Sequence, residues 1–373
     1  MTEPDWGRPP WRVDYAPPAA PLPAQCDVAV VGAGFTGLSA AYHLARRGVR
    51  VAVVEASRLG AGASGRTGGI VLEGTAAGPL EGVDRCLDAL AGVVDEAGID
   101  CDLRLPGCWE LSHTSDAGSR RAFWRDGGTQ LVIADTVPGG TIDPGALVAG
   151  LARAAAAAGA TVHEHAMVRL LEPGRSVVLH LDGARVLADH VVVALNAYTT
   201  ALLAIPLRVD SALTLAVCTP PLDPAALAAL GLAERVPFYT LDLPYLWGRT
   251  VRDGRLVLGA GLLMAESGDV ASLTLHGPDG TASLARLETR IAGLHPALAG
   301  TVIRERWGGP IAFTSTRTPV LSRLPEASNV VVSAGCAGHG IALGVRVGQL
   351  VAAAIVDGLP LPAWGALPGA PTS

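Results

Sequence analysis

The sequence contains no lysine, and all 28 of its basic residues are arginines. Lysine is the residue that forms Schiff bases with pyridoxal phosphate and with carbonyl substrates. Its absence therefore excludes lysine-based covalent catalysis. The net charge of -6 also indicates no basic surface for nucleic acid, so no nucleic-acid partner is expected.

Long apolar runs are absent as well. Half of the residues are hydrophobic, yet no run approaches the ~20 apolar residues that span a bilayer, so we expect no membrane partner. The first residues, Met1–Trp6, contain neither the basic region nor the apolar core of a signal peptide. These features predict a cytoplasmic protein, and 373 residues are enough for two domains.

The sequence also lacks a recognisable metal site. Its six cysteines form no CxxC pair and no ligand-like spacing, so reduced and buried thiols are expected. His163 and His165 would share one face of a strand, but no third ligand is placed near them in the sequence. We therefore expect no bound metal.

A dinucleotide-binding pattern occupies the N-terminal region. Asp27–Val31 and Val51–Val54 are apolar runs typical of buried parallel strands. Between them, three glycines open an alanine-rich helix: Gly32, Gly34 and Gly37. Glycines at this spacing permit a tight turn, close approach of a pyrophosphate and close packing of helix on strand. Glu55 ends the second strand, where a carboxylate suits ribose hydroxyls. The alternative is an ordinary tight turn without a ligand.

A second glycine-rich segment, Arg58–Ile70, follows this pattern and is rich in Gly, Ala and Ser. Glycine imposes no side-chain clash and tolerates positive φ, so backbone amides can surround a bulky cofactor. A nicotinamide enzyme has no clear need for such a loop. The segment therefore favours FAD over NAD, and a flexible surface loop is the alternative.

Five further motifs lie along the chain in a defined order: Trp11–Tyr15, Gly62–Ile70, Ala194–Tyr198, Arg306–Gly309 and Gly335–Gly340. Together they resemble the D-amino-acid-oxidase-like family of FAD-dependent oxidoreductases, above all its γ-glutamylputrescine oxidase branch. Glycine oxidase and sarcosine oxidase are more distant relatives. The resemblance covers nearly the whole chain and implies an α/β fold (α+β overall), with a Rossmann-like FAD-binding domain and an interleaved, β-rich substrate domain.

The resemblance also implies a set of contacts to FAD. Those on and beside the nucleotide fingerprint are Gly32, Ala33, Gly34, Phe35, Thr36, Gly37, Glu55, Ala56, Ser57, Arg58 and Val168. Those in the later motifs are Gly62, Ala63, Ser64, Arg66, Thr67, Gly68, Gly69, Ile70, Ala194, Asn196, Gly335, Gly338, His339, Gly340 and Ile341.

In the resembling family the two domains are interleaved along the chain. We predict an FAD-binding domain from residues 1–79, 141–201 and 310–373, and a substrate domain from 80–140 and 202–309. The part of the second domain between residues 110 and 140 is shorter than in the relatives. The pocket is therefore expected to be more open or to be completed by a partner subunit, which leaves a homodimer open.

Apolar periodicity predicts the remaining elements. Helices are expected over Asp84–Gly98, Ala146–Ala158, Ser283–Ala292 and Ile341–Asp357. Strands are expected over Val162–Leu170, Val177–Leu181, Arg185–Ala194, Leu213–Val217, Tyr245–Thr250, Arg255–Gly261 and Val330–Ser333. Asp143 and Pro144 suit the start of the second helix, as a cap and a first-turn residue.

Flavin-dependent amine oxidation requires a neutral amine whose α-hydrogen lies near flavin N5, so that hydride transfer gives an imine. Reduced flavin tends to be anionic, and the amides that start the last helix, at Gly338–Ile341, can supply positive potential. His339 is a candidate for flavin contact or proton transfer. The alternative for His339 is a structural hydrogen bond within the turn.

Two departures from the family bear on the substrate. Amino-acid oxidases of the family carry a Gly-x-Arg-Pro element whose arginine binds the substrate carboxylate, and Ile311 stands in its place here. A carboxylate bound there would lose its hydration without gaining a partner, which favours an amine over an α-amino acid. Arg249 is a candidate to bind a carboxylate from another direction. Tyr245 and Trp247 would wall the substrate site, although an ordinary half-buried strand is the alternative.

Two other positions concern oxygen and cofactor attachment. Sarcosine-type oxidases use a lysine near the flavin to react with dioxygen, and Val257 stands at that position. Another basic residue would have to replace it, or the enzyme is a dehydrogenase. Gly309 stands where those enzymes carry the flavin-linking cysteine, so FAD is expected to be non-covalent.

The sequence therefore predicts an FAD-dependent amine oxidoreductase that gives an imine, with dioxygen as the favoured acceptor and H2O2 as the product. An α-amino-acid or N-methyl amino-acid oxidase or dehydrogenase is the first alternative. A flavin monooxygenase or pyridine-nucleotide reductase would need a second GxGxxG motif, and none is found in the sequence. A catalytically silent flavoprotein is the remaining alternative.

Overall fold

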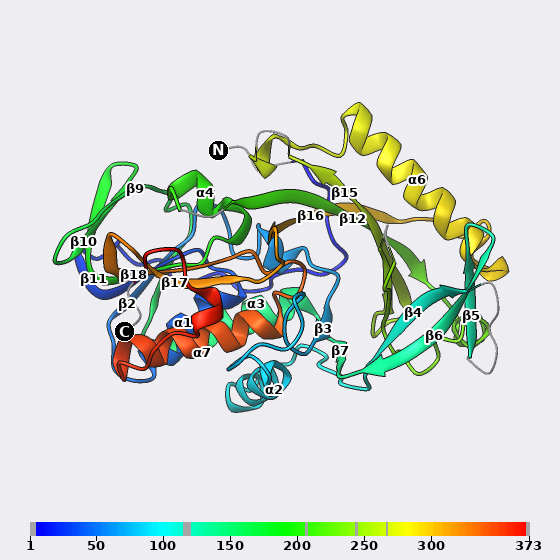
Figure 1. The fold of residues 1–373 in the computed structure, drawn as a ribbon, viewed down its shortest axis with the longest axis horizontal. Coiled ribbons are helices and arrows are strands. Elements are labelled where there is room, and N and C mark those ends of the chain that lie inside the picture. Colours follow the sequence, from blue (N-terminus) through cyan, green and yellow to red (C-terminus); the bar gives the residue numbers. More distant parts are fainter. Residues whose placement is uncertain (1–4, 115–120, 206–207, 243–244, 266–267, 371–373) are drawn as a thin grey trace.

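The computed structural model describes residues 5–114, 121–205, 208–242, 245–265 and 268–370 of the chain. Two eight-stranded sheets and a two-stranded ribbon form its framework (Figure 1). The ribbon pairs β3 (Ile70–Leu72) with β7 (Gly139–Thr141). The mixed α/β architecture that the sequence predicts is confirmed.

The first sheet has the strand order β17-β18-β11-β1-β2-β8, with the hairpin β9–β10 attached to β11. Its strands are β1 (Gln25–Val31), β2 (Val51–Val54), β8 (Thr161–His163), β9 (Val168–Glu172), β10 (Val177–Leu181), β11 (Ala184–Val193), β17 (Val320–Leu324) and β18 (Ala327–Ala334). The central pairings β1–β2, β1–β11 and β11–β18 are parallel. Valine and alanine dominate these strands because both faces are covered.

Three helices cover one face of this sheet: α1 (Phe35–Ala45), α3 (Pro144–Ala157) and α7 (Ala342–Val356) (Figure 1). The hairpin β9–β10 contributes to the core on the opposite face. Helix α1 can lie close to α7 because Gly348 has no side chain; a Cβ atom there would clash with Ser39. The Ser39 hydroxyl donates to the Val345 carbonyl at 2.8 Å. The predicted cap of α3 is confirmed, since Asp143 accepts a hydrogen bond from the Ala146 amide at 2.9 Å.

The second sheet has the order β16-β12-β15-β14-β13-β4-β6-β5, and of its pairings β13–β4 is parallel. Its strands are β4 (Cys108–Thr114), β5 (Ala122–Asp126), β6 (Thr129–Val137), β12 (Val209–Pro221), β13 (Phe238–Thr240), β14 (Leu246–Thr250), β15 (Arg255–Met264) and β16 (Glu305–Thr314). Helix α6 (Pro278–Leu294) covers one face, where the core of this sheet lies (Figure 1). The opposite face turns toward the glycine-rich loops of the first sheet.

The described residues form three further α-helices. They are α2 (Cys86–Glu96), which packs on α7, α4 (Thr199–Leu202) and α5 (Pro224–Ala229). Among the described residues, no helix combines the length and the apolar character needed to cross a membrane. The cytoplasmic location stays a prediction.

The predicted strand Val162–Leu170 is wrong in one respect. The structure has two short strands there, β8 and β9, and the chain turns between them at His165, whose φ is 55°. The apolar pattern continues through this turn, so periodicity alone could not find it. Strand β16 runs unbroken past the predicted boundary between residues 309 and 310, and the division into domains stays a prediction.

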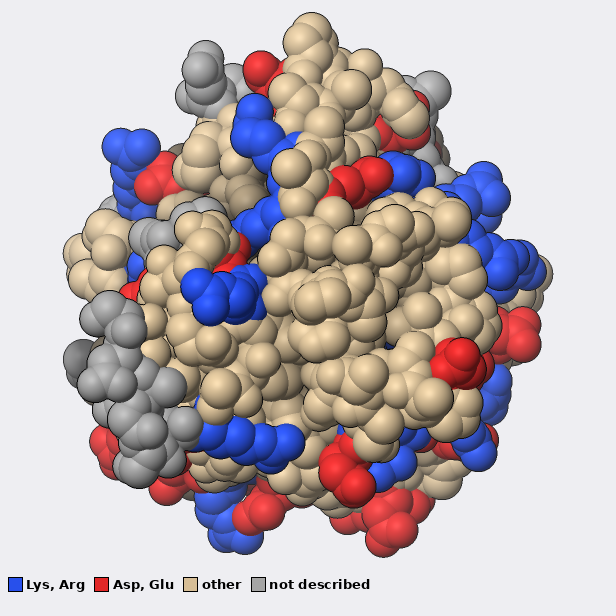
Figure 2. Space-filling model, turned by 90° about the vertical axis from the view of Figure 1, so that its right-hand side faces the viewer, with Lys and Arg blue, Asp and Glu red and all other residues tan. Residues whose placement is uncertain are grey.

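Charge is dispersed on the end of the molecule that faces the viewer in Figure 2. Acidic and basic side chains alternate around a broad area of other residues there. Among the residues coloured in that view, no block of one sign gathers on this face, which agrees with the low charge of the sequence.

Candidate flavin and substrate site

Glycines shape the turn between β1 and α1. Gly32 has a φ of 102°, and a side chain there would meet the carbonyl oxygen of Ala194. A side chain on Gly37 would clash with the carbonyl oxygen of Gly32, so the first turn of α1 can lie against the end of β1 only without one. The helix therefore starts at the carboxyl end of a central parallel strand, where nucleotides bind in such sheets.

Polar groups converge on this helix start. Glu55 accepts hydrogen bonds from the amides of Ala33 and Ser57, each at 3.0 Å. Burial raises the pKa of Glu55 even though these bonds oppose the shift. Ser64 accepts a hydrogen bond from the Phe35 amide at 3.1 Å, at the N-terminal end of α1. Backbone amides at such a helix end are also the groups that bind phosphate in proteins.

The remaining predicted contacts to the nucleotide lie beside these groups. Thr36 is in the first turn of α1, and Ala56 and Arg58 follow Glu55 at the end of β2. Val168 begins β9 and belongs to the buried cluster that also contains Val54. The structure therefore brings the predicted nucleotide contacts to one edge of the first sheet.

Two tryptophans and the N-terminal segment hold the loop from Gly62 to Ile70. The indole N–H of Trp11 donates to the Gly65 carbonyl at 2.8 Å, and Arg66 donates to the Gly7 carbonyl at 2.9 Å. The indole N–H of Trp307, on β16, donates to the Arg66 carbonyl at 2.9 Å. The two tryptophan rings meet edge to face, with centroids 5.5 Å apart.

Two side chains of β14 lie against the glycines of this loop. The Trp247 ring fills space that side chains on Gly68 or Gly259 would occupy. Arg249 donates from Nε to the Gly68 carbonyl, and its guanidinium lies 5.4 Å from the Trp11 ring centroid. The predicted contacts Ala63, Thr67, Gly69 and Ile70 belong to the same loop and its continuation into β3.

Arg249 is 1% exposed, and burial lowers its pKa to about 10. Within the described part of the chain, no carboxylate lies within salt-bridge distance of it, in contrast to Arg235, which pairs with Asp102. Its guanidinium lies against Gly68, Gly69 and Trp11. A role in binding a substrate carboxylate stays a prediction.

The C-terminal motif forms a turn that is attached to both sheets. Asn196 accepts hydrogen bonds from the amides of Gly335 and Cys336 at 3.0 and 3.3 Å. The Ala337 amide donates to the Ala312 carbonyl of β16 at 2.9 Å. Asn196 and Ala337 have φ values of 47° and 49°, which non-glycine residues adopt uncommonly.

The tip of this turn carries Gly338 (φ 88°), His339, Gly340 and Ile341, directly before α7. A side chain on Gly338 would contact the Cδ1 atom of Ile311 at 3.5 Å, so the predicted substrate residue Ile311 faces the turn. The His339 amide donates to the Cys336 carbonyl at 2.9 Å, and burial lowers the pKa of the imidazole. His339 is therefore neutral near pH 7.

Tyr245, the third predicted substrate residue, lies just before β14. Its hydroxyl accepts a hydrogen bond from Arg317 at 2.8 Å, and the guanidinium lies 5.9 Å from its ring centroid. Arg317 follows the end of β16, two strands beyond β15 in the sheet order. The structure thus brings Tyr245, Trp247 and Ile311 to the face of the second sheet that turns toward the loops.

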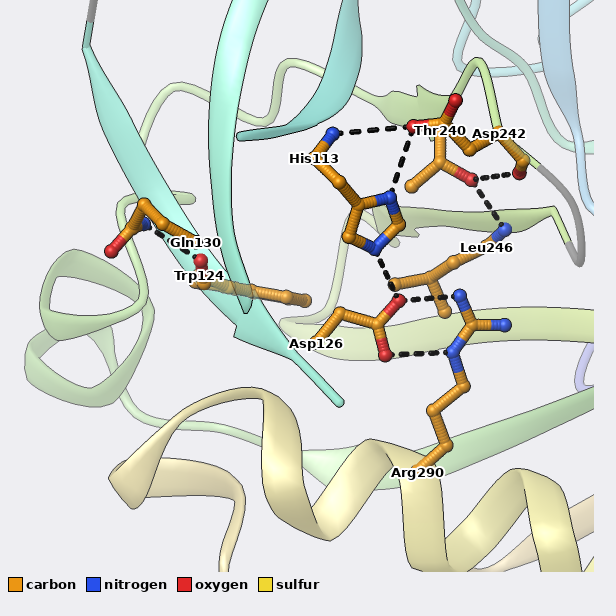
Figure 3. Close-up of polar contacts among 8 residues, drawn as sticks. All are labelled: His113, Trp124, Asp126, Gln130, Thr240, Asp242, Leu246 and Arg290. Carbon is orange, nitrogen blue, oxygen red and sulfur yellow. Dashed lines mark hydrogen bonds and ion pairs between the residues drawn. The ribbon is translucent and has the colours of Figure 1, made fainter. Parts of the chain in front are cut away.

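Asp242, which follows β13, is hydrogen-bonded to His113 of β4 at the far end of this sheet (Figure 3). His113 donates its amide to the Asp242 carboxylate at 3.2 Å, and its two ring nitrogens lie 3.0 Å from Asp242 and from Asp126. Arg290 of α6 binds Asp126 through two nitrogens. Burial lowers the pKa of His113, but the hydrogen bonds to Asp242 and Asp126 outweigh it, so the pKa lies above its ordinary value.

Sequence reasoning missed several groups on the site-facing side. Glu110 and Tyr239 lie in register with Trp247, and the Tyr239 hydroxyl donates to the Glu110 carboxylate. These residues come from separate strands that no sequence motif connects. Trp307 and Trp11, in contrast, belong to motifs that were identified in the sequence, although their hydrogen bonds to the loop were not predicted.

Comparison with known proteins adds an independent line of observation. A family described as FAD dependent oxidoreductase (DAO) matches residues 27–354. The chain is 28% identical over 376 residues to gamma-glutamylputrescine oxidoreductase of Escherichia coli (strain K12), covering 88% of this chain and 83% of that protein. It is also 28% identical over 364 residues to glycine oxidase of Geobacillus kaustophilus (strain HTA426), covering 87% of this chain and 92% of the relative.

Solved structures show the same fold. Glycine oxidase from Geobacillus kaustophilus superposes with a TM-score of 0.73 at 23% identity, covering 92% of this chain and 99% of the other. L-proline dehydrogenase from P. horikoshii superposes with a TM-score of 0.72 at 18% identity, covering 92% of this chain and 96% of the other.

Proposed function

Because the chain belongs to the family of FAD-dependent oxidoreductases, we propose that it oxidises the C–N bond of a small amine. FAD, when bound, would supply the acceptor for a hydride from the carbon next to nitrogen; the amine would become an iminium ion, which gives the imine by losing a proton to water. Dioxygen or another acceptor would then take up the electrons, with H2O2 as the product from dioxygen. The predicted FAD cofactor is confirmed by the family.

The residues of this chain fit the cofactor. Glu55, at the end of β2, can accept hydrogen bonds from a ribose. The amides at the start of α1, where Ser64 accepts a hydrogen bond from Phe35, can bind the pyrophosphate. The backbone of Gly338 can approach a flat ring closely because this residue carries no side chain. We expect non-covalent binding, since Gly309 offers no thiol.

The observation that carries the choice of an amine is the apolar side chain of Ile311 against the turn at Gly338. A substrate carboxylate placed there would lose its hydration and gain no charged partner. Neutral His339 lies in the same turn, and a neutral imidazole can donate one hydrogen bond and accept another. It could therefore position the amine without repelling it.

One observation favours the rival function, an α-amino-acid or N-methyl amino-acid oxidase. Arg317, held by Tyr245, presents a guanidinium at the edge of the same face. A planar guanidinium is well suited to bind a carboxylate with two hydrogen bonds. A substrate entering from that edge would have its carboxylate outward and its amine inward.

The test is anaerobic reduction of the purified flavoprotein. We expect the flavin absorbance of the FAD-loaded protein to be bleached by primary or secondary amines and not by glycine, sarcosine or D-amino acids. Admitting air then distinguishes an oxidase from a dehydrogenase by the rate of reoxidation. Bleaching by amino acids alone would favour the rival, and a folded protein that cannot retain FAD would overturn the proposal.

A matched variant sharpens the choice. Ile311→Arg restores the residue type of amino-acid oxidases at this position, and we expect it to allow amino acids to bleach the flavin. Arg317→Met should leave amine oxidation unchanged if amines are the substrates. Loss of activity toward amino acids in Arg317→Met, with the wild type active on them, would support the rival instead.

A further inference from the structure

A row of side chains crosses the second sheet on the face that turns toward the flavin loop. The strand registers place Glu110 of β4 beside Tyr239 of β13, and Tyr239 beside Trp247 of β14. Trp247 in turn lies opposite Gly259 of β15. Because paired residues in a sheet point to the same face, Glu110 and Tyr239 share the face on which Trp247 covers Gly68.

The outer end of this row is acidic. The Tyr239 hydroxyl donates to one oxygen of Glu110, and Asp135 of β6 lies next in register. Within the described part of the chain, no donor is recorded for the second oxygen of Glu110, and no arginine pairs with it. Burial, followed by the bond to Glu110, raises the pKa of Tyr239, so the phenol stays a neutral donor to the Glu110 carboxylate.

Glu110 lies close enough to Trp247 for one small molecule to contact both side chains. Glu110 is two strands from Trp247, and strands lie about 4.8 Å apart, so the two backbones are separated by roughly 10 Å. Tyr239 and Glu110 are both partly exposed rather than packed in the core. The Trp247 ring between them and the loop offers an apolar wall that also attracts cations.

We propose that the Glu110–Tyr239 pair binds a second, positively charged group of the substrate while Trp247 lines the path to the reacting amine. This inference rests on the proposed amine oxidation and narrows its substrate class to amines with two cationic groups. The free carboxylate oxygen of Glu110 accepts hydrogen bonds from the outer ammonium group, and Glu110 is thereby a specificity-determining residue.

The test compares two ligands of matched shape on the FAD-loaded protein. Putrescine carries an ammonium group at each end, and n-pentylamine replaces one of them by a methyl group. Dissociation constants are measured by titration calorimetry without oxygen, on portions of each protein whose flavin has been reduced beforehand with dithionite, so that neither amine is consumed. We expect the wild type to bind putrescine at least about tenfold more tightly, the size of a hydrogen bond to a charged group. Glu110→Gln, which keeps the shape, should abolish this preference and leave binding of n-pentylamine unchanged.

Tyr239→Phe is the second variant. It keeps the Glu110 charge and removes one hydrogen bond, so the preference for putrescine should fall only in part. The inference is overturned if the wild type shows no preference, or if Glu110→Gln weakens both ligands equally. Flavin content and melting temperature establish whether each variant is folded. The comparison of putrescine with n-pentylamine on the wild type remains valid even if a variant does not fold.

The same samples separate this inference from the proposed function. If putrescine binds in a Glu110-dependent manner but does not bleach the flavin, the binding site stands and amine oxidation fails. If both amines bleach the flavin equally and bind equally, amine oxidation stands and the inference fails.

Discussion

The sheet that contains β1 and the sheet that contains β14 present their binding groups in different ways. In the first sheet the side chains of the strands are small and apolar, and the candidate binding groups are backbone amides and glycines at the strand ends. In the second sheet the binding groups are side chains that project from the middle of several strands, such as Trp247 and Tyr239. If the proposed function holds, the cofactor would be bound mainly by backbone groups and the substrate mainly by side chains.

This difference has a physical consequence for tolerance to mutation. A backbone site is lost when a side chain is added where none fits, because the chain itself must move. A side-chain site can exchange its groups while the sheet stays intact, because the strands are held by their own hydrogen bonds. We therefore expect substitutions in the first sheet to remove FAD and those in the second to change which substrate is bound.

The strongest test of the contrast is Gly37→Ala. The added methyl group would clash with the Gly32 carbonyl oxygen and push α1 away from β1. We expect a protein that no longer retains FAD, measured by the flavin absorbance after purification. Gly92→Ala on α2 is the control, since a side chain there meets nothing within 4 Å and alanine favours a helix. Full FAD retention in Gly37→Ala would contradict the assignment of this turn.

A second test concerns the junction of the two regions. Trp11→Ala removes the hydrogen bond to Gly65 and the contact with Trp307, and it leaves a cavity. A buried tryptophan replaced by alanine costs about 3–5 kcal/mol of unfolding free energy, and we expect FAD binding to weaken with it. Trp11→Phe keeps most of the ring and should cost less. Urea unfolding with and without FAD measures both effects, and equal stability of Trp11→Ala and wild type would refute the role of this contact.

A third test asks what the buried charge of Arg249 does. Keeping an unpaired guanidinium buried is unfavourable for the fold, so Arg249→Met should leave the melting temperature of the apoprotein equal or higher. We expect its FAD affinity to fall about tenfold, because a hydrogen bond from a charged group to the loop is lost. Arg249→Lys, which keeps the charge, should be intermediate. A drop in apoprotein stability without a change in FAD affinity would show that the charge serves the fold alone.

The smallest expected effect is a pH dependence confined to the second sheet. The folded-state pKa of His113 lies above its ordinary value of about 6.5, so its contribution to stability is complete below that pH. The contribution is lost as the pH rises through the folded-state pKa. The melting temperature of the wild type should therefore fall further than that of His113→Gln as the pH rises from about 6 to about 8. Parallel curves for the two proteins would contradict this.

His43, His163, His190 and His339 shift in the opposite direction, because burial lowers their pKa values. Their contributions to stability are lost as the pH falls. The plot of melting temperature against pH for the wild type alone therefore combines opposite pH dependences. The difference between wild type and His113→Gln isolates the one group that links Asp126 to Asp242.

The same contrast explains what could be predicted from the sequence. The turn at Gly32, Gly34 and Gly37 and the acid at Glu55 lie within one short segment, so their spacing carries the geometry. The family, the fold and FAD followed from such local motifs and are confirmed. The hydrogen bond from the Gly335 amide to the Asn196 side chain joins residues 139 positions apart, yet both residues belong to motifs identified in the sequence.

The acidic pair was not predictable in this way. Glu110 and Tyr239 are 129 positions apart, and their meeting depends on β4 and β13 being parallel neighbours, which no local pattern encodes. The burial of Arg249 was missed for a similar reason, since its neighbours Gly68 and Trp11 come from distant segments. Single strands indicate which side chains share a face, and only the order of strands indicates which of them meet.

The interleaving of the first sheet also sets the timing of its assembly during synthesis. Strand β1 pairs with β11, β11 pairs with β18, and α1 packs on α7, so the earliest and the latest parts of the sheet depend on one another. A nascent chain leaves the ribosome with an open edge beside β1 and an uncovered α1 until α7 has been made. Such a chain exposes apolar surface for most of its synthesis, and aggregation competes with folding until α7 can cover α1.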